Sequence, residues 1–105
     1  MTKTFLCAAL LAACTSASST GITSANLSCD SSLTYANFGS AFIQTNCLSC
    51  HATKEQPTLS TQAQILANSS RILEQAVYTT AMPQDTNISN AERQMLGDWL
   101  QCGAP

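Results

Sequence analysis

Three side chains with useful chemistry stand within the five residues CLSCH, at positions 47–51. Cys47 and Cys50 are separated by two residues, and His51, the only histidine in the chain, follows directly. Such a group can be a redox-active dithiol, half of a zinc site, or the covalent attachment point of a haem. The three interpretations imply different proteins, so the surrounding sequence has to discriminate between them.

The surrounding sequence favours the haem. A structural zinc site needs four protein ligands, usually in two clustered pairs, and this chain has one histidine. A thioredoxin-like dithiol follows a strand, whereas the residues before Cys47 have helical periodicity. A haem needs two thiols that can bond its vinyl groups and an adjacent imidazole that can bind its iron. We therefore expect one covalent haem c on Cys47 and Cys50 with His51 on the iron, and we retain a haem-free dithiol protein as an alternative.

A methionine is the expected second axial ligand, because the single histidine is already used. Met95 falls on the apolar face of the last expected helix, so we expect it in the core. Met82 precedes Pro83 in a loop, and the proline restricts that loop, which lowers the entropy lost when a thioether is held on iron. The sequence therefore predicts His51 and Met82 as the two metal ligands, with an exposed or gap-filling Met82 as the alternative.

The N-terminal residues are typical of an export signal. Lys3 precedes an apolar run that is too short to span a bilayer but suits a secretory signal peptide. The sequence Leu-Ala-Ala before Cys14 resembles the lipobox of bacterial lipoproteins. We expect residues 1–13, with Cys7, to be a cleaved lipoprotein signal peptide and Cys14 to be the site of lipidation. An ordinary signal peptide that is cut nearby is the alternative.

The next segment, residues 14–32, is rich in serine and threonine and poor in large apolar side chains. Such a composition buries too little surface to become ordered, so we expect a flexible lipidated tether with a reach of about 20 Å. The functional domain would then be residues 33–105, held at the periplasmic side of a bacterial membrane in the cell envelope.

Helical periodicity runs through residues 33–105. Apolar residues recur at spacings of three and four in residues 33–45 and again in residues 60–79, where Ser60 or Thr61 can cap either one long helix or two short ones that are broken near residues 68–70. Ser89 and Glu92 form a capping-box pattern before a final amphipathic helix, and Gly103 offers a left-handed stop. Residues 81–88 have loop chemistry. With no alternating strand pattern, we predict an all-α fold.

These motifs together resemble the class I, single-haem c-type cytochromes. The resemblance covers residues 35–105 and comprises CLSCH, the later Met82-Pro83 and the ending SNAERQMLGDWLQCGAP. It implies a small helical domain wrapped around one haem, in which the helix before the haem motif crosses the last helix. Phe38, Gly39 and Phe42 would then pack near Met95, Trp99 and Leu100.

A domain as small as this one commonly relies on a cross-link, a metal or another staple beside its core. Cys29 and Cys102 lie just outside the two helices that the fold brings together, so a disulfide between them is expected. Intermolecular bonding, or two free thiols, remain the alternatives. The chain departs from better-known members of the family in having these two cysteines and in having no cluster of lysines.

With His51 and Met82 filling both axial positions of the iron, a substrate has no open site, so we expect a one-electron carrier rather than an enzyme. No second histidine or paired acid and base suggests catalysis. The alternative is a ligand-binding or sensory haem domain in which Met82 is absent from the iron or leaves it. The chain has four basic and six acidic residues and a formal charge of −2, so nucleic acid is excluded as a partner. We expect transient contacts with redox proteins, and a membrane contact through the lipid anchor.

Overall fold

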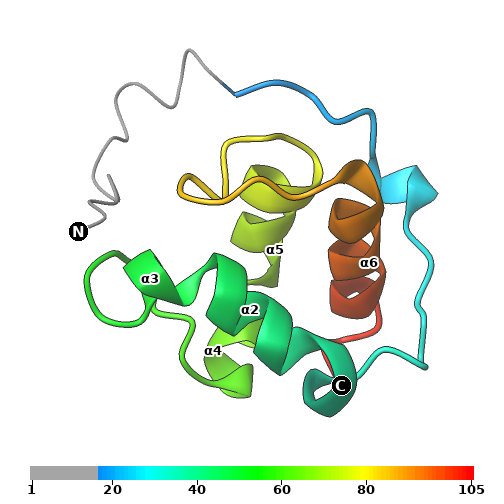
Figure 1. The fold of residues 1–105 in the computed structure, drawn as a ribbon. Helices are drawn as coiled ribbons and strands as arrows, with labels where there is room; N and C mark the ends of the chain where they lie inside the picture. The colour runs from blue at the N-terminus through cyan, green and yellow to red at the C-terminus, as the bar shows by residue number, and fades with distance from the viewer. Residues whose placement is uncertain (1–16) are drawn as a thin grey trace.

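The computed structural model describes residues 17–105, so the expected signal peptide and the lipidation site Cys14 lie outside the described residues. Over residues 17–105 the chain forms helices and no strand, which confirms the all-α prediction. The elements are η1 (Ser24–Asn26), η2 (Tyr35–Gly39), α2 (Ser40–Asn46), α3 (Leu48–His51), α4 (Gln62–Ala67), α5 (Ser69–Ile72), η3 (Leu73–Val77) and α6 (Asn90–Gln101). Figure 1 shows α2, α5 and α6 arranged around the centre of the domain.

The last helix, α6, begins and ends as the sequence predicted. The Ser89 hydroxyl accepts from the backbone N–H of Glu92 at 3.1 Å, and the Glu92 carboxylate accepts from the N–H of Ser89 at 3.0 Å. Gly103 follows with φ of +89°.

The expectation that Met95 lies in the core is wrong, because Met95 is 40% exposed. Successive helical residues are about 100° apart, and Met95 falls beside the buried stripe of α6, which contains Arg93, Leu96, Gly97, Trp99 and Leu100.

The first helical segment crosses α6, as the family resemblance implied. η2 and α2 run on from one another, and Gly39 is buried against Trp99. A Cβ atom at Gly39 would lie 2.2 Å from Cζ2 of Trp99, so only glycine allows this approach. The rings of Phe38 and Trp99 meet edge to face with centroids 5.9 Å apart. This crossing fixes the helix that leads into CLSCH against the C-terminal helix.

The sequence left open one long middle helix or two short ones, and the structure has the segment broken at Asn68. Thr61 caps α4 by accepting from the N–H of Gln64 at 3.1 Å. Asn68 ends α4 with φ of −111° and ψ of 18°, and α5 and η3 follow. The apolar side chains Ile72 and Val77 of α5 and η3 are buried, and η3 packs against α6. The loop after η3 therefore starts beside α6.

The segment before residue 33 differs from the flexible tether that the sequence suggested. Ile22 and Leu27 are buried in the core, and the N–H of Ser28 donates to the Asp98 carboxylate at 3.0 Å. Thr20 donates its hydroxyl to the carbonyl of Val77 at 2.6 Å. The two apolar side chains and these hydrogen bonds dock the segment onto the domain, although Ile22 and Leu27 form no periodic apolar pattern in the sequence. The packed domain therefore begins before Leu33.

A disulfide links this segment to the end of the last helix. The sulfur atoms of Cys29 and Cys102 are 1.85 Å apart, at bonding distance, and join residues 73 positions apart in the sequence. The bond connects the N-terminal segment to the C-terminal end of α6. Within residues 17–105, none of the helices combines the length and the apolar character that crossing a bilayer requires.

Candidate functional site

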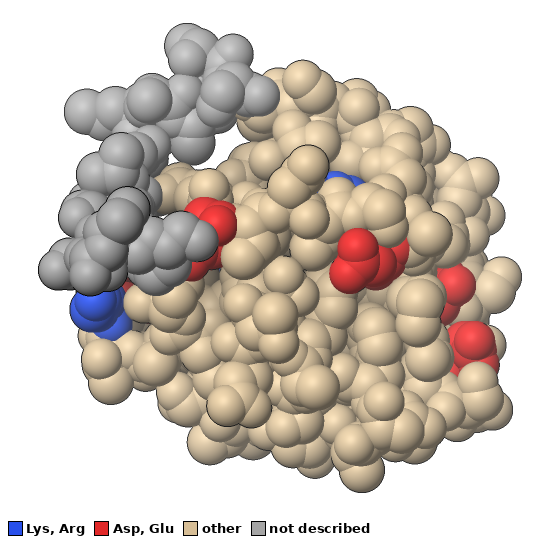
Figure 2. Space-filling view, viewed as in Figure 1, with Lys and Arg blue, Asp and Glu red and all other residues tan. Residues whose placement is uncertain are grey.

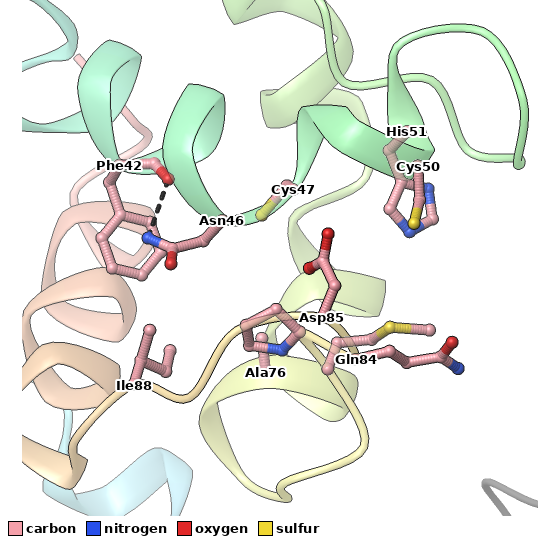
Figure 3. Close-up of a pocket in the computed structure, with 11 residues that line it drawn as sticks. Phe42, Asn46, Cys47, Cys50, His51, Ala76, Gln84, Asp85 and Ile88 are labelled. Carbon is pink, nitrogen blue, oxygen red and sulfur yellow. Dashed lines mark hydrogen bonds between the residues drawn. The ribbon is translucent and has the colours of Figure 1, made fainter. Parts of the chain in front are cut away.

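Cys47, Cys50 and His51 line a hollow between α2–α3 on one side and η3 with its following loop on the other (Figure 3). The hollow has two adjoining parts of about 360 and about 30 Å³, which share Cys47, His51, Ala76 and Met82 in their walls. The larger part is further lined by Gln56, Pro57, Leu59, Arg71, Ile72, Glu74 and Gln75, and the smaller part by Phe42, Asn46, Cys50, Pro83, Gln84, Asp85 and Ile88. All four residues that the sequence predicted for cofactor binding therefore contribute to one hollow.

His51 ends α3, and the loop that follows holds its ring. Nδ1 lies 2.8 Å from the carbonyl oxygen of Pro57 and 3.3 Å from that of Glu55. Because a carbonyl only accepts, these contacts require the tautomer with the proton on Nδ1, in which Nε2 keeps its lone pair. A histidine that binds a metal typically donates its other ring N–H in this way, which fixes both its tautomer and its orientation. The contacts of the His51 ring thus occupy Nδ1 and leave Nε2 as the ring nitrogen with a lone pair for a further partner.

The loop is itself anchored at both ends, which explains why the ring is held. The N–H of Leu59 donates to the carbonyl of His51 at 2.7 Å, and the hydroxyl of Ser60 donates to that of Ala52 at 3.1 Å. Leu59 is buried in the core. The residues that orient His51 thus lie within nine positions of it in the sequence.

The thiol of Cys47 is not prepared for redox exchange as a thiolate. Burial raises its pKa to about 12, and the nearby Asp85 carboxylate adds to the rise. Reactive cysteines of dithiol oxidoreductases have the opposite shift, because positive charge or a helix N-terminus stabilises their thiolate. The environment of Cys47 therefore argues against the haem-free redox dithiol.

Met82 is half-buried against the hydrophobic core, and its backbone is held on both sides. Its N–H donates to the carbonyl of Gln75 at 2.7 Å. Its carbonyl accepts from Nη1 of Arg93 at 2.7 Å. The loop that carries Met82 is thereby fastened to η3 and to α6.

Polar contacts join the two sides of the hollow beside the cysteines. The Ser49 hydroxyl donates to the Asp85 carboxylate, and the Thr86 hydroxyl donates to Oδ1 of Asn46 at 3.0 Å. Asn46 is buried, and its amide also donates to the carbonyl of Phe42 at 3.0 Å (Figure 3). These contacts connect the helix that ends at CLSCH to the loop that follows Met82.

Sequence reasoning did not single out Asn46, Asp85 or Arg93 for this site. A signal existed for Arg93, because it stands in line with Leu96 and Leu100 on the apolar stripe of α6, where a charged residue is unusual. Asp85 was recognised only as part of a turn. The face of the molecule in Figure 2 has few charges, and they are scattered over it.

No protein-family model, curated protein or solved structure was found to match this chain. Its function must therefore be inferred from the chemistry and geometry of its own residues.

Proposed function

We propose that this protein is a one-electron carrier that holds a single haem c through Cys47 and Cys50, with His51 and Met82 as the iron ligands. The observation that carries the proposal is the His51 ring, whose Nδ1 donates to Pro57 beside a hollow that Met82 also lines. By this proposal the chain is a small class I c-type cytochrome whose helices wrap around the haem.

The residues of the hollow fit such a group. Its larger part, at about 360 Å³, falls in the size range of small-molecule and cofactor sites, roughly 300–1,000 Å³. The buried side chains Phe42, Ile72 and Ile88 make parts of the walls of the hollow apolar. When bound, a haem supplies a ferric/ferrous couple, which no amino-acid side chain provides.

The two ligands determine which kind of haem protein is favoured. His51 offers a neutral imidazole and Met82 a thioether, so both axial positions would be filled by the protein. With no open position, the site favours electron transfer over the binding of a small ligand, and the soft thioether favours the ferrous state. Because both side chains belong to anchored segments, little rearrangement accompanies gain or loss of an electron.

We further propose that a lipid on Cys14 attaches the protein to the periplasmic side of a bacterial membrane. The docking of Ser18 supports a short attachment, since the N–H of Ser18 donates to Thr80 at 3.0 Å and its carbonyl accepts from the N–H of Thr80 at 2.9 Å. Only residues 15–17 separate the two positions, which span at most about 14 Å of extended chain. The domain would therefore be close to the bilayer and would meet its redox partners there, through transient contacts.

The experiment that tests the proposal is an absorption spectrum of the matured protein in both oxidation states. We expect covalent haem that resists extraction with acidified organic solvent, and a ferric far-red band from sulfur on iron. The variant Met82→Ala should lose that band, and the reduced variant should bind CO readily. The variant Met95→Ala is the matched control, since Met95 is exposed on α6, and it should keep the band.

Three results would count against the proposal. A colourless protein from a host that matures c-type cytochromes would remove the haem and favour a dithiol protein. Rapid CO binding by the reduced wild-type protein at neutral pH would favour the ligand-binding alternative. Survival of the far-red band in Met82→Ala would assign the second ligand to another residue.

A further inference from the structure

Arg93 is the one arginine of the described chain that is buried, with only 3% of its surface exposed. It stands near the start of α6, on the same stripe as Leu96 and Leu100. Burying a guanidinium is unfavourable unless its N–H groups find acceptors, and burial lowers the pKa of Arg93. The N–H groups of the Arg93 guanidinium must therefore have acceptors inside the fold.

The guanidinium binds backbone carbonyls at the end of η3 and in the loop beyond. Its Nη1 lies 2.7 Å from the carbonyl oxygen of Ala76, 3.2 Å from that of Thr79 and 2.7 Å from that of Met82. The last carbonyls of a helix have no partner within the helix, and they carry partial negative charge. Arg93 therefore satisfies the end of η3 and, through the same nitrogen, ties that end to Met82.

The contact with Met82 is one half of a clamp on its backbone. The N–H of Met82 donates to Gln75 at 2.7 Å, while its carbonyl accepts from Arg93. Hydrogen bonds from a charged donor are stronger than neutral ones, and this one is partly buried. The position of the Met82 Cα atom, from which the thioether extends, is thus set from η3 and from α6 together.

We propose that Arg93 is a positioning residue that holds Met82 where its sulfur can bind the haem iron, an inference that rests on the proposed function. Arg93 touches neither the iron nor the haem in this role. Arg93 acts through the backbone of Met82. Loss of Arg93 should therefore release the Met82 sulfur from the iron, while His51 stays bound to the iron and Cys47 and Cys50 stay bonded to the haem.

The test uses the matured haem protein with Arg93→Leu and Arg93→Lys. Arg93→Leu should lose most of the ferric far-red band and should bind cyanide about tenfold faster or more, because cyanide binds after Met82 leaves. Arg93→Lys, which keeps a charge but has a shorter and less branched donor, should fall between this variant and the wild type. Haem attachment and the intense absorption of the His51-bound haem should be unchanged in both.

Gln94→Leu is the matched control. Gln94 is the next residue of α6, and its amide donates to the carbonyl of Asn26 at 3.0 Å and to Asp98 at 3.0 Å, away from Met82. It loses hydrogen bonds of a similar kind, so it should lower the melting temperature and leave the far-red band and the cyanide rate at wild-type values. A purely structural role for Arg93 would give the same pattern in Arg93→Leu.

The outcomes separate this inference from the proposed function. A wild-type far-red band and cyanide rate in folded Arg93→Leu would overturn the inference and leave the proposed function intact. A wild-type protein without the band would overturn both. If neither variant folds, proton exchange at the Arg93 guanidinium of the wild-type haem protein decides, with slow exchange supporting the clamp and rapid exchange overturning it.

Discussion

His51 and Met82 line the same hollow, but different parts of the chain hold them. The ring of His51 is oriented by the carbonyl of Pro57, six residues away, in a loop anchored on α3 itself. The backbone of Met82 is held by Gln75 of η3 and by Arg93 of α6, and its loop is bordered by the docked N-terminal segment. One side of the site is therefore local in sequence, and the other depends on contacts between distant elements.

This difference has a consequence for stability and ligation. A ligand held by its sequence neighbours survives loss of distant contacts, whereas a ligand held by three converging elements is released when any one of them loosens. In the proposed haem protein, we expect Met82 to leave the iron in response to changes that do not affect His51. The following predictions test that expectation, in order of decreasing effect.

Removing the sulfur bridge should have the largest effect and should weaken both sides together. The double variant Cys29→Ser with Cys102→Ser opens a loop of 73 residues, which corresponds to a loss of about 4 kcal/mol in the chain-entropy model. Denaturant unfolding of the wild type with its disulfide intact, compared with the double variant, measures this loss of unfolding free energy. The far-red band should persist without denaturant, and an unchanged unfolding midpoint would contradict the role of this bridge.

Gly39→Ala should destabilise the contact between α6 and the helical segment that leads to His51. An added Cβ meets Trp99 at 2.2 Å, so we expect a loss of about 1–3 kcal/mol from overpacking. Helix propensity alone would raise the free energy of unfolding by about 1 kcal/mol. The sign of the measured change therefore shows whether overpacking against Trp99 outweighs helix propensity. Ala36→Gly, at an exposed position of the same helix, should lose up to about 1 kcal/mol from propensity alone. Urea unfolding checks both.

Two helix caps offer a matched comparison of the two sides. Ser89 caps α6, which carries Arg93, and Thr61 caps α4, which follows the loop that orients His51. Ser89→Ala and Thr61→Ala should each cost about 1 kcal/mol in unfolding free energy. Only Ser89→Ala should also speed cyanide binding, and equal cyanide rates in the two variants would contradict the asymmetry between the two sides.

The docked N-terminal segment should make a smaller contribution to the Met82 side. Thr20→Val keeps the shape of the side chain and removes the hydroxyl that donates to Val77, so we expect a loss of about 1 kcal/mol. Thr45→Val, at an exposed position of α2, is the control and should change stability little. Thermal unfolding measures both, and a wild-type melting temperature for Thr20→Val would show that the docking is not stabilising.

Much of the fold could be predicted from the sequence because its signals are local. The capping box at Ser89 and the left-handed Gly103 each depend on the preferences of a few adjacent residues, whereas the sequence left open whether the middle helix breaks near Asn68. The exposure of Met95 was missed because helical periodicity leaves the edge of an apolar stripe undefined until a neighbour covers it. The docking of residues 18–28 was missed because its contacts are with residues some 57 to 70 positions away.

The sequence by itself determined that two cysteines and a histidine occupy one turn and that helices surround them, because spacing and periodicity are properties of neighbouring residues. Only the tertiary structure decided what orients His51, what holds Met82, and that Arg93 is buried between η3 and α6. Those contacts depend on how helices cross and where loops return, and packing selects these from many arrangements that satisfy the same local preferences.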